Sequence, residues 1–91
     1  MSKIVFDDGS IIEWIDKETL RYSEGGFILN IWVDFEPGFF SSGRIVRAAL
    51  IKDWSTTPPG VASTISAVKR HDILDKVKKY YQANKRKCHI V

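Results

Sequence analysis

Near the C-terminal end of the chain, apolar and polar residues recur with the 3.6-residue period of an α-helix. The pattern predicts one helix over residues 67–83, about 25 Å long, with Ser66 as its N-cap and Asn84 as a left-handed C-terminal cap. A helix with one apolar side needs a sheet to cover it. The apolar side consists of Ile73, Leu74, Val77, Tyr80 and Tyr81, and the polar side of His71, Asp72, Asp75, Lys76, Lys78 and Lys79.

The segments before this helix alternate apolar and polar residues with the period of two that is typical of β-strands. Phe27, Leu29, Ile31, Val33 and Phe35 share one side of the strongest predicted strand and are expected to face the helix. The sequence therefore predicts an α+β fold, with an antiparallel sheet of five to six strands packed against one C-terminal helix. The predicted strands cover residues 3–7, 10–15, 19–23, 27–35, 44–54 and, as a short final strand, 87–91.

Turn residues separate the predicted strands. Asp8-Gly9 is a favoured pair for a two-residue type I′ hairpin turn. Glu24-Gly25-Gly26 predicts a second tight turn before the strongest strand. Pro58 and Pro59 lack amide donors, so the strand that precedes them has to end before the helix begins.

Length and composition fit one folded domain over residues 1–91, with 44% hydrophobic and 27% charged residues. No apolar run is long enough to cross a bilayer, and the N-terminal residues lack the apolar core of a signal peptide. We therefore expect a cytoplasmic protein without membrane association. Cys88 is the single cysteine, which excludes an internal disulfide and a cysteine cluster for zinc.

The net charge of +3 is unevenly distributed. Residues 1–62 carry six basic and nine acidic residues, whereas residues 63–91 carry eight basic and two acidic residues. A lysine-rich helix face is most often a solvated surface, and its carboxylates suit ion pairs with lysines four residues later. The alternative interpretation is a small nucleic-acid-binding module. Its contacts would be Lys76, Lys78, Lys79 and Lys85.

No catalytic, metal-binding or phosphate-binding motif is recognisable in the sequence. His71 and His89 have no partner at metal-ligand spacing. Cys88 and His89 are neighbours in one predicted strand, so their side chains point to opposite faces and cannot form a catalytic pair. No glycine-rich loop of the phosphate-binding type leads into the helix. We therefore expect no catalytic residues, no metal and no cofactor.

Aromatic residues are frequent around the end of the strongest strand. Trp32 lies on the strand face opposite the predicted core, and two phenylalanines follow in a loop rich in glycine and serine. One interpretation is a loop that folds back over the core, and the other is an aromatic surface with an acidic rim that binds a protein. The same surface would also suit a homodimer. The candidate partner-binding residues are Trp32, Asp34, Glu36, Phe39, Phe40 and Arg44.

Residues 27–91 combine a predicted strand that ends at Trp54, a proline pair, a helix with Arg70 three residues before Ile73-Leu74, and a short final strand. This arrangement resembles the small α+β immunity proteins of bacterial polymorphic-toxin and contact-dependent growth inhibition systems. The resemblance implies a cytosolic, non-enzymatic protein that neutralises one cognate toxin domain by direct contact. Such toxins are frequently nucleases with basic clefts, which an acidic rim would complement.

Overall fold

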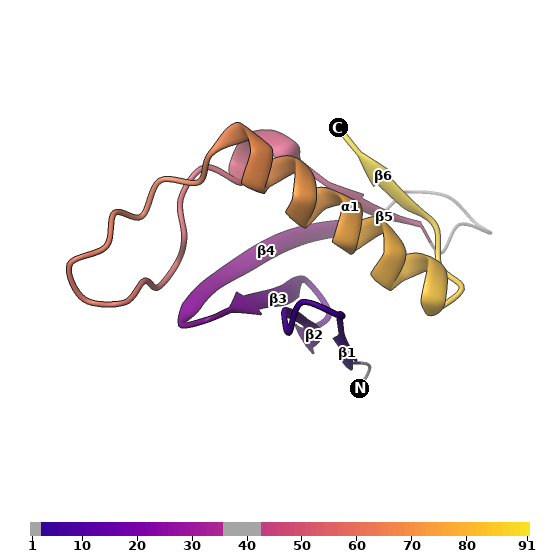
Figure 1. The fold of residues 1–91 in the computed structure, drawn as a ribbon. Coiled ribbons are helices and arrows are strands. Elements are labelled where there is room, and N and C mark those ends of the chain that lie inside the picture. The colour runs from indigo at the N-terminus through magenta and orange to yellow at the C-terminus, as the bar shows by residue number, and fades with distance from the viewer. Residues whose placement is uncertain (1–2, 36–42) are drawn as a thin grey trace.

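The computed structural model describes residues 3–35 and 43–91 of the chain (Figure 1). These residues form a six-stranded sheet, a short 3₁₀-helix and one α-helix. No helix in the described part of the chain combines the length and the apolar character needed to cross a membrane. The elements are β1 (Lys3–Val5), β2 (Ile11–Asp16), β3 (Thr19–Glu24), β4 (Phe27–Phe35), β5 (Arg44–Val46), η1 (Ala48–Leu50), α1 (Ala67–Ala83) and β6 (Cys88–Ile90).

The strands lie side by side in chain order, from β1 to β6. Neighbouring strands are antiparallel as far as β5, but β6 pairs with β5 in parallel. The predicted sheet, helix and short final strand are confirmed, whereas the prediction of a wholly antiparallel sheet is wrong at β6. The connection between β5 and β6 contains α1, which carries the chain back across the sheet. Consequently β6 runs in the same direction as β5.

The predicted strand over residues 44–54 is also wrong beyond Val46. The strand ends at Val46, and η1 follows directly. Ile51 and Trp54 are buried beyond η1, whereas Leu50 is 59% exposed. Apolar residues are almost continuous from Ile45 to Ile51, and such a run does not distinguish a strand from a helical turn.

The core lies between α1 and one face of the curled sheet (Figure 1). The predicted helix face is confirmed, because Ile73, Val77, Tyr80 and Tyr81 are buried and Leu74 packs against them. Leu29, Ile31 and Val33 of β4 are buried opposite the helix, as their alternation predicts. Cross-strand register continues this face into the neighbouring strands. The buried residues there are Ile12, Leu20, Tyr22 and Val46.

Of the two predicted hairpin turns, the second is confirmed and the first is wrong in its length. Gly25 and Gly26 both have positive φ, and Glu24 pairs with Phe27, so this is a two-residue turn of type I′. At the first hairpin only Gly9 has positive φ, and the Phe6 amide donates to the Ser10 carbonyl. Three residues therefore form the loop, and the predicted two-residue turn is wrong. Gly9 adopts the positive φ of the turn, which is unfavourable for a residue with a Cβ such as Asp8.

The ends of α1 show one confirmed cap and one correction. The Ser66 side chain accepts a hydrogen bond from the Lys69 amide, as predicted. At the other end, Asn84 has φ −91° and Lys85 has φ 57°, so Lys85 rather than Asn84 is the left-handed residue. The Arg86 amide donates to the Tyr81 carbonyl and the Lys85 amide to the Gln82 carbonyl. This pair of bonds is a Schellman motif with lysine where glycine is usual.

Replacing Lys85 with glycine should raise the free energy of unfolding by about 0.5–1 kcal/mol, because glycine has no Cβ to strain the left-handed conformation. Urea denaturation followed by circular dichroism measures the change. Asn84→Gly is the matched control. Asn84 already has a negative φ, and the substitution removes the hydrogen bond from Asn84 Nδ2 to the Tyr80 carbonyl. This control should be less stable than the wild type. Equal effects of the two variants would contradict the assignment.

A long connection leads from η1 to α1 and extends away from the sheet and helix (Figure 1). Its two arms meet at a neck, where the Trp54 amide donates to the Ser63 carbonyl and the Ile65 amide to the Lys52 carbonyl. Trp54 and Ile65 are buried and anchor the two arms in the core. Backbone hydrogen bonds also join one arm to Ile28 of β4. The connection is therefore an ordered loop held at its base.

Candidate binding surfaces

The sheet has a second face, which α1 does not cover. The strand register brings Val5, Ile11, Ser23 and Ile28 into one row across β1 to β4. A polar row crosses β2 to β4 next to it, through Glu13, Arg21 and Asn30. A third row pairs Thr19 with Trp32, and a fourth joins Asp34, Ile45 and His89. We call this surface the open face, and its side chains are partly or fully exposed.

Trp32 is the largest exposed aromatic side chain on the open face. It is 50% exposed, and its Nε1 donates a 2.8 Å hydrogen bond to Asp34 Oδ1. Asp34 in turn forms an ion pair with Arg47, which follows β5. The tryptophan ring is therefore held in one orientation by its neighbours. An exposed but oriented tryptophan is typical of a protein-binding surface.

The other predicted partner-binding residues are distributed differently. Glu36, Phe39 and Phe40 lie outside the described residues. Arg44 lies on the helix side of the sheet and is only 8% exposed, so the surface position that we expected for it is wrong. Val46 is buried on the same strand two residues later, and residues two apart share a face. The alternation along the strand therefore contained the signal that places Arg44 inside.

Arg21 is a residue of the open face that the sequence analysis missed. It lies between Glu13 and Asn30 in the register, and its Nε is buried without a hydrogen-bond partner among the described residues. A buried donor without a partner costs about 1–3 kcal/mol. Arg21 as a whole is partly exposed, so a carbonyl or carboxylate oxygen of a binding partner would contact the exposed part of this side chain rather than the shielded Nε. Alternation with Leu20 and Tyr22 was the available signal, because both are core residues.

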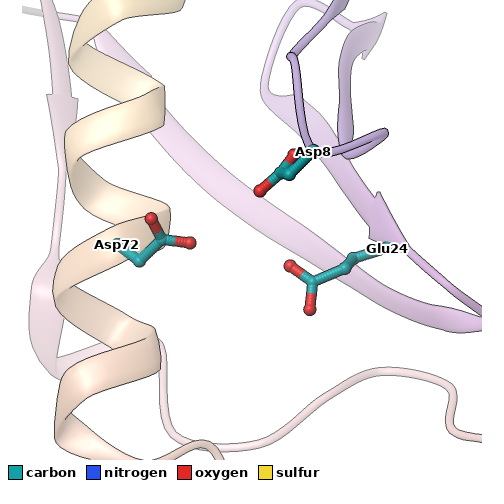
Figure 2. Close-up of side chains that lie close together, drawn as sticks. All are labelled: Asp8, Glu24 and Asp72. Carbon is teal, nitrogen blue, oxygen red and sulfur yellow. The ribbon is translucent and has the colours of Figure 1, made fainter.

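Three carboxylates from distant parts of the chain meet at the other side of the sheet, next to the helix. In Figure 2, Asp8 of the first hairpin turn and Glu24 of β3 face Asp72 of α1. One oxygen of each lies within 4.8 Å of the others. Oxygen clusters of this kind suit divalent cations. Whether this cluster is an open metal site or a set of ion pairs depends on the positively charged side chains around it.

Two lysines of α1 supply those charges. Lys69 Nζ lies 2.9 Å from Glu24 Oε2, and Lys76 Nζ lies 2.5 Å from Asp8 Oδ2 and 3.1 Å from Asp72 Oδ2. Three negative and two positive groups leave a residual charge of only −1. Because ammonium groups already bind the carboxylates, this arrangement is a set of ion pairs rather than an open metal site. We call Asp8, Glu24, Asp72, Lys69 and Lys76 the charge network.

The pKa values in the charge network follow from these contacts. Hydrogen bonds from Lys76 and from Ser10 hold the pKa of the Asp8 carboxyl well below its usual range. Burial disfavours the charged form of Lys76, but hydrogen bonds to Asp8 and Asp72 outweigh it and raise its pKa. Burial, with a hydrogen bond to Glu24, raises the pKa of Tyr22 to about 12. Asp8 and Lys76 are therefore charged at neutral pH, and the network joins α1 to the first hairpin and β3.

The four lysines proposed for nucleic-acid binding do not form one surface. Lys76 is 7% exposed and belongs to the charge network, so its predicted place on the solvated helix face is wrong. Lys79 is exposed and pairs with Asp75 at 3.1 Å, as the spacing predicts. Lys78 lines a groove of about 300 Å³ between α1 and β6, together with Arg86, Lys87 and His89. The remaining lysine, Lys85, is exposed in the Schellman motif.

Cys88 lies in the same groove and is half-buried. Burial raises the pKa of its thiol, so the thiolate that nucleophilic chemistry requires is disfavoured at neutral pH. His89 pairs with Ile45 on the open face, whereas Cys88 pairs with Arg44 on the helix side. The expected placement of these two side chains on opposite faces is confirmed.

The fold and these surfaces define a small α+β protein with one sheet face covered by a helix and one uncovered. Comparisons with protein-family models, curated proteins and solved structures find no match for this chain.

Proposed function

We propose that this protein is an immunity protein, which binds a cognate bacterial toxin domain in the cytoplasm and neutralises it by direct protein contact. The proposal rests on the sequence resemblance and on one structural observation. The open face presents an oriented, half-exposed tryptophan close to an arginine whose buried Nε has no partner among the described residues. Tryptophan and arginine are the residues that most often dominate the binding energy of protein interfaces.

The chemistry of the open face describes the partner surface that would fit it. The partner would place apolar side chains against Trp32 and an acceptor oxygen within reach of Arg21. Asp34 is already neutralised by Arg47, so the described part of the face offers little net negative charge to a basic cleft. The proposed contact therefore depends on apolar burial and hydrogen bonding. The proposal applies to a toxin of any enzymatic activity, including a nuclease.

Replacing Trp32 with alanine should weaken binding of the toxin by roughly 30-fold or more, since a central tryptophan typically contributes 2 kcal/mol or more. The tagged protein is first used to capture its partner from the native cell lysate, with and without nuclease treatment and at low and high salt. The captured toxin domain is identified by mass spectrometry, purified and titrated calorimetrically. Val68→Ala is the control, because Val68 is 82% exposed on α1, away from the open face.

Three results bear on the proposal. One stoichiometric toxin whose binding and neutralisation are lost with Trp32→Ala and retained with Val68→Ala would support it. Recovery of nucleic acid whose binding falls steeply with salt would replace it by the nucleic-acid alternative at Lys78 and its neighbours. A homodimer that Trp32→Ala converts to a monomer, with no captured toxin, would assign the open face to self-association instead.

A further inference from the structure

A pocket of about 90 Å³ opens beside the C-terminal end of α1, away from the charge network. Leu20 and Val33 of the sheet contribute core side chains to it. Trp14 from β2 and the adjacent helix residues Tyr80 and Tyr81 provide aromatic walls. The pocket is therefore an apolar, aromatic cavity that continues from the core to the surface.

The charged residues that line this pocket are all basic. They are Lys17, Arg44 and Arg86, and no Asp or Glu lines the pocket within the described residues. Arg86 lies over the Trp14 ring, 5.9 Å from its centroid. Arg44 is buried and donates to the Gly43 carbonyl; burial and the nearby Arg86 lower its pKa. Several cations thus converge on one aromatic cavity.

Neutral hydrogen-bond donors complete the lining. Burial raises the pKa of Tyr81 far above its usual value, so its hydroxyl remains protonated. Asn84 and Thr19 also line the pocket. Cations, a phenol and an amide beside planar rings form a set that recognises an anionic group attached to a flat body.

We propose that this pocket binds a small organic anion, with its phosphate or carboxylate group held by Arg86 and Lys17 and its planar ring against Trp14. A cavity of about 150 Å³ accommodates a benzene ring. The smaller pocket here would therefore hold the anionic group with part of a ring, and the rest of the ligand would lie in solvent. The pocket shares only Thr19 with the open face and includes neither Trp32 nor Arg21, so this site is independent of the residues proposed to bind the toxin.

A second role for the same cations would be to stabilise the C-terminal end of α1. That role is the alternative that the experiment has to distinguish from anion binding. Basic side chains near a helix C-terminus interact favourably with the helix dipole, and Arg86 lies three residues beyond the end of α1. If that interaction accounts for the basic cluster, the pocket has no affinity for small anions. Binding measurements separate the two roles.

The test is a titration of the ¹⁵N-labelled full chain with phenyl phosphate and, separately, with benzoate, followed by NMR. The indole N–H signal of Trp14 should shift with either compound at concentrations up to about 10 mM, the range of weak millimolar binding. Benzyl alcohol, which has the ring without the charge, should bind at least about tenfold more weakly. Inorganic phosphate and acetate show how much of the affinity belongs to the anionic group alone.

Arg86→Gln should weaken phenyl phosphate binding by about tenfold or more, because a charge-assisted hydrogen bond is lost. Lys87→Gln is the matched control, with the same loss of charge at the next residue, which does not line the pocket. Thermal unfolding of both variants verifies that the fold is retained. The proposal is overturned if Trp14 does not shift, if benzyl alcohol binds equally well, or if both glutamine variants behave alike. Each of these results leaves the immunity proposal untouched.

Discussion

Replacing Trp54 with alanine should lower the free energy of unfolding by about 3–5 kcal/mol, the range for large aromatic side chains in a core. Trp54 is buried and lies against two other rings, with centroid distances of 6.0 Å to Tyr22 and 5.1 Å to Phe27. It also anchors one arm of the loop between η1 and α1, next to the hydrogen bond with Ser63. One substitution therefore opens a cavity and loosens the base of the loop.

Urea denaturation, followed by far-UV circular dichroism, measures this change. Trp32→Ala is the matched control, with the same substitution at a half-exposed position on the open face, and it should cost less than about 1 kcal/mol. A domain of this size has on the order of 5–10 kcal/mol of stability, so the Trp54 variant should lose a large fraction of it. Similar losses for the two tryptophan variants would show that Trp54 is not part of the core.

Replacing Lys76 with alanine should lower the free energy of unfolding by more than the loss of an exposed ion pair, because the buried lysine contacts two carboxylates, although Asp8 and Asp72 themselves are about half exposed and screened by solvent. The Lys76 ammonium contacts both Asp8 and Asp72 and lies 5.6 Å from the centroid of the Tyr22 ring. Without it, three carboxylates of the charge network share one lysine, and the net charge of the site becomes −2. The helix would then be held less firmly against the first hairpin.

The dependence of this effect on pH distinguishes an ion pair from simple packing. The folded-state pKa of Asp8 is depressed, so its stabilisation is complete above the unfolded value of about 3.9 and is lost as pH falls through the folded value. The folded-state pKa of Lys76 is raised, so its contribution is complete below about 10.4 and is lost only at higher pH. The difference between wild type and Lys76→Ala should therefore be constant from about pH 5 to 9 and should shrink in acid.

Lys79→Ala is the control for the charge network. Lys79 pairs with Asp75 at the same helical spacing that joins Lys76 to Asp72, but both side chains are exposed to solvent. Exposed pairs of this kind contribute about 0.3–0.5 kcal/mol, so this variant should be close to wild type. A pH-independent loss for Lys76→Ala, or a loss no larger than that of Lys79→Ala, would mean that the charge network does not stabilise the fold.

The helix and the strongest strand could be predicted because their side chains divide into two faces. Five apolar residues at helical spacing placed α1, and Ser66 provided the N-cap that marks its start. In β4, Leu29, Ile31 and Val33 alternate with residues of the open face. The same alternation placed Trp32 and Asp34 on the uncovered side of the sheet. Periodicity is sufficient here because each element buries one side only.

The sequence by itself determined the α+β class, the position of the helix, the face that β4 buries and the surface position of Trp32. These features depend on local periodicity and on residues close together in the chain. Only the tertiary structure decided the parallel direction of β6, the burial of Lys76 and Arg44, and the pairing of Asp34 with Arg47. Those features depend on which distant segments meet: Lys76 looks like a solvated helix lysine until Asp8, 68 residues earlier, is brought against it.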